Sequence, residues 1–374
     1  MEFLQLPFNT IIAYFIPFIV ALTIIVFIHE FGHYYIARLC GVKIETFSIG
    51  FGKEIVGWHD AKGTRWKLCW LPLGGYVKFH GDANGASLPS ASPDTARDPG
   101  NFHGKKIWQR AAVVAAGPFA NFIAAIFIFA GIYMFVGERV ADPVVGTVLP
   151  GSVAAEAGMK PGDIIKKIDG KAITTFNELQ TTVFDRAGDT IALTLDRQGS
   201  TVELEVVPRV EEIPDGFGGK SRVGRLGIQA SADPSAVRTI TYGFPDAVVK
   251  GAKQTWFVIR TTLRYMGKMI MGRESPDQLR GPVGIMQIAG GAAASGLLPF
   301  LSFIGLISVS IGLINLFPVP MLDGGHLVYY SIEALRGKPL GQKAQEWGFR
   351  IGVSMVMLLL IVATWNDLVR NLGG

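Results

Sequence analysis

The chain has 374 residues, enough for two or three domains. Hydrophobic residues make up 49% of it and charged residues only 17%, against ~25% in soluble domains, so the composition indicates a membrane protein. A formal net charge of +5 without a long Lys/Arg run predicts no nucleic-acid partner, and two cysteines, Cys40 and Cys69, are too few for a disulfide framework.

The first apolar segment runs from about Thr10 to Leu39 and carries no formal charge before His29. About 20 apolar residues span a hydrocarbon core, so this segment predicts a membrane helix. A basic n-region and a small-residue cleavage site are missing from the sequence, and we therefore expect a retained anchor rather than a signal peptide.

His29, Glu30 and His33 lie near the end of this helix, within "VFIHEFGHYYIARL". The two histidines are four residues apart and project from one face of the helix. In this H-E-x-x-H pattern both imidazoles bind zinc and the glutamate takes a proton from the attacking water. The alternative is a histidine pair that only meets headgroups and water. A catalytic zinc would also need a third protein ligand.

The loop that follows is basic and contains "GTRWKLCWLPLGGYVKFHG". This sequence predicts a β-hairpin with strands about Arg65–Trp70 and Tyr76–Phe79 and a bend at Gly74 and Gly75. The edge of such a hairpin can pair with an extended substrate backbone, although a plain hairpin is the simpler alternative.

The second apolar segment, Ala111–Val136, has no charged residue and closes a first region, residues 1–136. Gly117, Pro118 and Asn121 interrupt its apolar run, and small residues suit close helix packing. Asn121 either forms a hydrogen bond near the site or holds helices together, and the sequence favours the second role.

Residues 143–209 predict a compact β-rich domain with a hairpin at about Arg197–Ser200 and a helix in "FNELQTTVFDRAG". Within it, "GSVAAEAGMKPGDIIKKIDGKAI" resembles the α+β PDZ domain of bacterial membrane-associated proteases. An unrelated small β-rich domain is the alternative.

Residues 240–273 predict an amphipathic helix, because apolar residues recur at steps of three and four between lysines and arginines. We expect it to lie in the membrane interface, with packing against the β-rich domain as the alternative. Residues 281–374 then hold two further membrane segments, Leu297–Leu322 and Trp347–Trp365.

Asp323 follows the third segment in "NLFPVPMLDGGHLVYY". Pro318 and Pro320 prevent a regular helix there, and unwound backbone at membrane depth is tolerated only inside protein or beside a cavity. Asp323 is therefore the natural third ligand. His326 is not needed, because two histidines and one carboxylate complete the set.

Basic residues concentrate between the first and second segments and between the third and fourth. By the positive-inside rule these loops are cytoplasmic, and both termini and the region Gly137–Ser295 lie outside. The histidine motif and Asp323 then meet near the cytoplasmic side of the membrane.

"HEFGH" followed by "NLFPVPMLDGG" resembles the site-2 protease family of intramembrane zinc metalloproteases, and the PDZ-like stretch resembles its regulator-of-sigma-E protease branch. "PLGGYVKF", "WQRAAVVAAGPFANF" and "GPVGI" extend the resemblance over nearly the whole chain. Some members have two PDZ domains, whereas this sequence has one. The resemblance implies one zinc per chain held by His29, His33 and Asp323, with Glu30 as general base. It also implies substrate contacts by the residues Asn315, Gly74, Gly75 and Tyr76.

The fold implied is a polytopic α-helical membrane protein with about four transmembrane helices and an inserted extracytoplasmic PDZ domain, in a bacterial inner membrane. Its substrates would be single-spanning membrane proteins, such as an anti-sigma factor or a remnant signal peptide. An upstream site-1-type protease would make the first, extracytoplasmic cut, so that the process is regulated intramembrane proteolysis.

A catalytically silent scaffold that recruits partners through its PDZ domain is the alternative function. Such a relative is expected to have lost Glu30 or a ligand, and all four residues are present. A metal transporter would need ionisable residues along a membrane path, which the apolar segments lack outside this one cluster.

Overall fold

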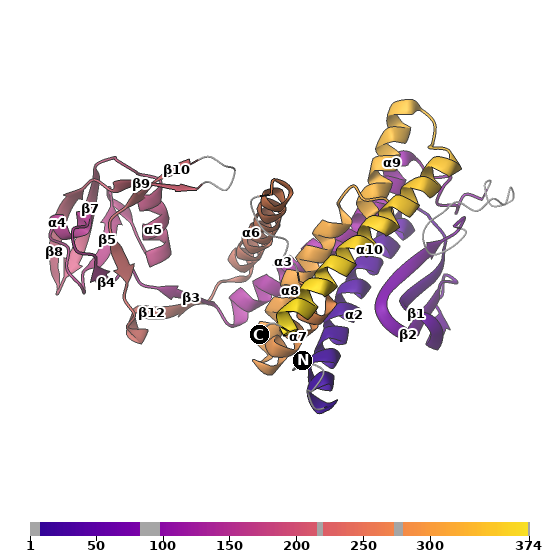
Figure 1. Ribbon diagram of the computed structural model, residues 1–374, viewed down its shortest axis with the longest axis horizontal. Coiled ribbons are helices and arrows are strands. Elements are labelled where there is room, and N and C mark those ends of the chain that lie inside the picture. The colour runs from indigo at the N-terminus through magenta and orange to yellow at the C-terminus, as the bar shows by residue number, and fades with distance from the viewer. Residues whose placement is uncertain (1–7, 83–97, 215–219, 273–279, 373–374) are drawn as a thin grey trace. The chain divides into compact units, whose positions relative to one another are not determined.

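A computed structural model of the protein describes residues 8–82, 98–214, 220–272 and 280–372 (Figure 1). The chain divides into two compact units. The first combines the residues up to 130 with those from 248 onward, and the second contains residues 131–247. We describe each unit by itself.

Four helices of the first unit are long and apolar enough to cross a membrane. They are α2 (Phe8–Leu39), α3 (Ile107–Phe135), α8 (Leu297–Asn315) and α10 (Gln342–Leu372). The four expected membrane segments are therefore helical. In the third segment the helix ends at Asn315, before Pro318 and Pro320, which deny the chain regular helical hydrogen bonds as expected.

Two helices of this unit were not separated by the sequence analysis. The shorter apolar helix α7 (Pro282–Ala294) packs against α2 and α8, where Ala289 joins Ile25 and Ile304 in a buried cluster. Helix α9 (Asp323–Arg336) follows the loop after α8 and lies at the end of the helix bundle far from both chain ends (Figure 1).

Helix α6 (Phe244–Ile270) corresponds to the expected amphipathic helix, and the end of that prediction at residue 273 lies outside the described residues. Its buried positions include Gly251 and Thr255. Trp256 and Leu263 are exposed apolar side chains on it.

The loop after α2 forms two long strands, β1 (Ile44–His59) and β2 (Arg65–Phe79). Thr46 pairs with both Lys78 and Arg65, so the beginning of β1 lies between the two ends of β2. The expected pairing of Arg65–Trp70 with Tyr76–Phe79 is therefore wrong. Both segments pair with β1 instead, and the buried Ile44 and Phe47 of β1 join Val77 and Phe79 of β2 in one hydrophobic core.

The second unit is β-rich. Its elements are β3 (Glu138–Ala141), β4 (Val145–Val148), α4 (Val153–Glu156), β5 (Ile164–Ile168), β6 (Lys171–Ala172), α5 (Phe176–Phe184), β7 (Ile191–Arg197), β8 (Ser200–Val206), β9 (Arg209–Pro214), β10 (Lys220–Arg225), β11 (Ile228–Ala230), the 3₁₀ turn η2 (Pro234–Ala236) and β12 (Val237–Ile240). A four-stranded sheet has the order β6-β5-β7-β8. The expected hairpin is confirmed, since Arg197 pairs with Ser200.

This unit extends beyond the expected boundaries of 143–209. Strand β11 pairs with β4, β12 pairs with β3, and β9 and β10 form a hairpin of their own. The later strands are short and their partners lie far back in the chain, so the local sequence pattern gave no reason to include them.

Candidate metal centre

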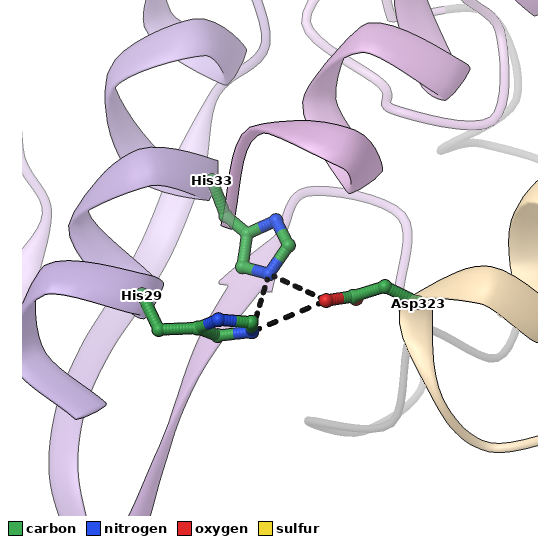
Figure 2. A group of neighbouring side chains, drawn as sticks. All are labelled: His29, His33 and Asp323. Carbon is green, nitrogen blue, oxygen red and sulfur yellow. Dashed lines mark hydrogen bonds and ion pairs between the residues drawn. The ribbon is translucent and has the colours of Figure 1, made fainter. Parts of the chain in front are cut away.

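Three side chains from two helices meet in the first unit. His29 and His33 project from α2, one turn apart, and Asp323 points toward them from the first residue of α9 (Figure 2). The Nε2 atoms of the two histidines are 3.2 Å apart. Asp323 Oδ2 lies 3.1 Å from His29 Nε2 and 3.5 Å from His33 Nε2. The structure thus brings together the three ligands expected from the sequence.

The loop between α8 and α9 places Asp323. Met321 in this loop has φ +90°, a conformation that costs a residue with a Cβ atom of order 1–3 kcal/mol and that collects at functional sites. Gly324 and Gly325 let the first turn of α9 approach the loop, because a methyl group on either residue would overlap the carbonyl oxygen of Leu316 or Val319. The two glycines after Asp323 are thus needed for the close packing that places Asp323.

Helix α3 forms the back of the site. Gly117 faces both imidazoles, and a methyl group there would overlap His33 Nε2 and lie 2.9 Å from His29 Nε2. One turn earlier, the Val113 carbonyl oxygen accepts a 2.8 Å hydrogen bond from His33 Nδ1. Since a neutral imidazole carries one proton, this bond leaves the Nε2 lone pair of His33 directed at the other two ligands.

The three ligand atoms fit a zinc ion. Atoms about 2.0–2.1 Å from a tetrahedral zinc are about 3.3–3.4 Å from one another, close to the separations found here. Both histidines are only 8% exposed, and Asp323 Oδ2 is buried without a hydrogen-bond partner among the described residues. Buried lone pairs that face each other are unfavourable unless a cation lies between them.

A cavity of about 220 Å³ opens at this centre. Besides the three ligands, the predicted residues that line it are Glu30, Gly75, Tyr76 and Asn315. Gly74 is not part of the lining and lies at the preceding bend of β2. The Val77 main-chain N–H donates to the Glu30 carboxylate, so the last segment of β2 holds this acid beside the ligands.

Seven further lining residues were not predicted as part of the site: Val77, Phe79, Val114, Met321, Leu322, His326 and Phe349. His326 follows Asp323 by one turn, and burial lowers the pKa of its imidazole, which favours the neutral ring. Among the described residues, the only three side chains whose ligand atoms converge are His29, His33 and Asp323. His326 is therefore a wall of the cavity and not one of these ligands.

Comparison with known proteins identifies the family. The model of peptidase family M50 matches residues 17–359 of the chain. The chain belongs to peptidase family M50. A protein of Rhizobium meliloti, provisionally named a zinc metalloprotease, is 47% identical, and the match covers 95% of this chain and 96% of that protein. The metalloprotease MmpA of Caulobacter vibrioides is 40% identical over 93% of this chain and 94% of that protein.

The expected site-2 protease family and the expected zinc-dependent peptidase activity are thereby confirmed. With four candidate spans, this M50 peptidase is a multi-pass membrane protein. Two solved structures also match part of this chain. They are the PDZ domain of an SdrC-like protein from Listeria monocytogenes, 22% identical over 23% of this chain and 84% of that chain, and a protein from Geobacillus thermodenitrificans, 30% identical over 24% and 95%. Each has a TM-score of 0.19.

Proposed function

We propose that this M50 peptidase hydrolyses peptide bonds in or near the membrane-spanning segment of single-spanning membrane proteins. The observation that carries the proposal is the convergence of His29, His33 and Asp323 beside Glu30, with both histidines on the apolar helix α2. A hydrolytic centre on such a helix acts on substrates that reach membrane depth.

The residues divide the chemistry among them. His29, His33 and Asp323 would hold one zinc ion per chain. When bound, zinc supplies a water of pKa about 7 as nucleophile and polarises the carbonyl that is attacked. Glu30 accepts the proton of the attacking water at its carboxylate and returns it to the leaving amine, while the Val77 N–H keeps that carboxylate in place. Asn315 lines the same cavity and positions the substrate or the oxyanion.

A substrate helix must unwind before it is cut, because its carbonyls are engaged in helical hydrogen bonds. The extended backbone then needs hydrogen-bond partners that lipid does not offer. We assign this role to the end of β2, beginning at Gly74, Gly75 and Tyr76. This segment borders the cavity and, within the part of the chain that the structure describes, pairs with β1 on one side only, so substrate backbone can add to its other edge.

The distribution of basic residues supports an orientation in a bacterial inner membrane with the metal centre near the cytoplasmic side and both termini and the β-rich unit outside. The β-rich unit is a PDZ domain on the sequence resemblance. It limits which substrates enter, so that an upstream protease must first shorten them. An anti-sigma factor or a remnant signal peptide fits this substrate class.

Helix α6 lies in the membrane interface. Its exposed apolar side chains Trp256 and Leu263 lie among basic residues, which suits contact with both lipid tails and headgroups.

Substitutions at the centre test this function. Glu30→Gln removes the base but no ligand, so we expect cleavage of a reporter with one transmembrane segment to fall by at least about 100-fold, with about one zinc per chain retained. His29→Ala, His33→Ala and Asp323→Ala should lower both zinc content and cleavage. Metal analysis of purified, folded protein separates the two groups. Full zinc occupancy in Asp323→Ala, or wild-type turnover in Glu30→Gln, contradicts the assignment.

A further inference from the structure

Asn121 is fully buried in α3, behind the metal centre, and its side chain contacts His29. The amide Nδ2 lies 3.3 Å from His29 Nδ1, the ring nitrogen that faces away from Asp323. The amide Oδ1 has no hydrogen-bond partner among the described residues. The sequence left open whether Asn121 serves the site or only joins helices, and these contacts point to the site.

The protonation of His29 decides how the two side chains interact. Its Nε2 faces His33 and Asp323, and a metal ligand must present a lone pair there, so the single proton of the neutral ring lies on Nδ1. Nδ1 is then a donor that needs an acceptor. An amide nitrogen beside it would place donor against donor, whereas a half-turn of the amide places Oδ1 at the same point. Because Oδ1 has no partner among the described residues, the half-turn breaks no other hydrogen bond of this oxygen, and the contact with His29 decides between the two orientations.

We propose that Asn121 is a positioning residue of the metal centre: its amide oxygen accepts the His29 Nδ1–H bond and thereby fixes the proton and the rotation of the ring. His33 is held in the corresponding way by the Val113 carbonyl oxygen. Helix α3 thus orients both imidazoles, one with its main chain and the other with a side chain. This inference rests on the proposed zinc site.

The main chain of Asn121 is itself anchored. Ser308 Oγ of α8 donates a 2.9 Å hydrogen bond to the Asn121 carbonyl oxygen, and Ser308 is fully buried. Asn121 therefore contacts α8 through its main chain and His29 on α2 through its side chain, and only the side-chain contact touches the ring. Partners of metal-binding histidines typically change metal affinity by 10–100-fold when removed.

Zinc affinity of the full-length protein in detergent, measured by competition with a chelator, tests the proposal. Asn121→Leu keeps the approximate volume and removes the acceptor, so we expect zinc to bind about 10–100-fold more weakly. Asn121→Asp keeps an acceptor at the same position and should bind zinc at least as tightly as the wild type. Ser308→Ala is the matched control: it removes a buried hydrogen bond to the same residue but leaves the amide, and affinity should stay within about twofold.

The visible spectrum of cobalt bound in place of zinc gives a second readout, because its ligand-field bands depend on ligand geometry. We expect Asn121→Leu to shift these bands and Asn121→Asp to preserve them. Wild-type affinity and an unchanged spectrum in Asn121→Leu would overturn the proposal. If the leucine variant does not fold, a loss of affinity of tenfold or more in folded Asn121→Asp overturns it as well. A wild-type protein that binds no zinc would instead contradict the proposed function.

Discussion

At the scale of single residues, space around the ligands matters as much as their chemistry. The two imidazoles face α3 at Gly117, where the structure leaves no room for a side chain. Gly131 belongs to the same helix, and a methyl group added there would meet no atom within 4 Å. Alanine substitutions at these two glycines therefore distinguish a steric effect on the metal centre from a general effect on the stability of α3.

Gly117→Ala should displace both imidazoles and lower zinc affinity at least tenfold, while the helix itself gains intrinsic propensity of about 1 kcal/mol. Gly131→Ala offers the same gain in propensity and should leave zinc binding unchanged. Chelator competition and thermal unfolding of both purified variants measure the two effects. Equal zinc affinity in the two variants would show that Gly117 does not shape the site.

At the scale of elements, local patterns were predictable and distant pairings were not. The charge-free runs of α2 and α3 identify membrane helices because the signal lies within each segment. The two histidines proposed as ligands were predictable for the same reason, since their spacing of four residues places them on one helix face. The position of β1 between both ends of β2 depends on contacts that no local window contains. The contact between Asn121 and His29 likewise depends on how closely two helices approach.

In the β-rich unit, a buried ion pair makes stability depend on pH. Asp163 is 1% exposed and accepts bonds of 2.8 Å from Arg197 Nε and Nη2. The Arg197 guanidinium holds the pKa of the Asp163 carboxyl below its ordinary value. Because the folded-state pKa is depressed, this carboxylate contributes stability above about pH 4, the pKa of an unfolded aspartate, and the contribution disappears as pH falls further.

Asp163→Asn should therefore destabilise the β-rich unit at pH 6, and its difference from the wild type should shrink as pH falls from about 4 toward 2. The free energy of opening of the β7 amides, from hydrogen exchange of the full chain corrected for intrinsic rates, measures this difference. Asp169→Asn is the control, because the pair of Asp169 with Arg186 is exposed and should contribute little at any pH. A difference for Asp163→Asn that is constant from pH 6 to pH 2 would contradict this account.

At the scale of the whole molecule, each unit has its own hydrophobic core. Ile165, Leu193 and Leu195 belong to the core of the β-rich unit, whereas Phe47 and Phe102 belong to a core of the first unit. Strands β3 and β12 close the β-rich unit, and Ala141 pairs with Val237. A deletion of the residues between Ala141 and Val237 keeps the pair of β3 and β12 and removes the whole core of the β-rich unit. A shorter deletion leaves some strands of the unit without partners.

Replacement of residues 142–236 by Asn-Gly should join β3 and β12 through a two-residue hairpin turn and leave a folded first unit with about one zinc per chain. Deletion of residues 143–209 alone removes β4 and most of the core, so β11 loses its partner strand and the hairpin of β9 and β10 loses the core beneath it. We expect the second variant to aggregate or to be degraded. The two variants are compared by their yield of monodisperse protein and by their metal content. Equal yield and equal metal content would mean that the strands after Arg209 do not belong to the β-rich unit.

The proposed metal centre takes its ligands from two distant segments of the chain, His29 and His33 from α2 and Asp323 from α9. During synthesis the ribosome therefore makes the proposed base Glu30 and the two histidines early. It makes Asp323 only after the strands β1 and β2 and the β-rich unit have been synthesised. A nascent chain beside other newly inserted membrane proteins holds an incomplete ligand set. Under the proposed assignment, a nascent chain that has not reached Asp323 therefore lacks the complete zinc site that peptide hydrolysis needs.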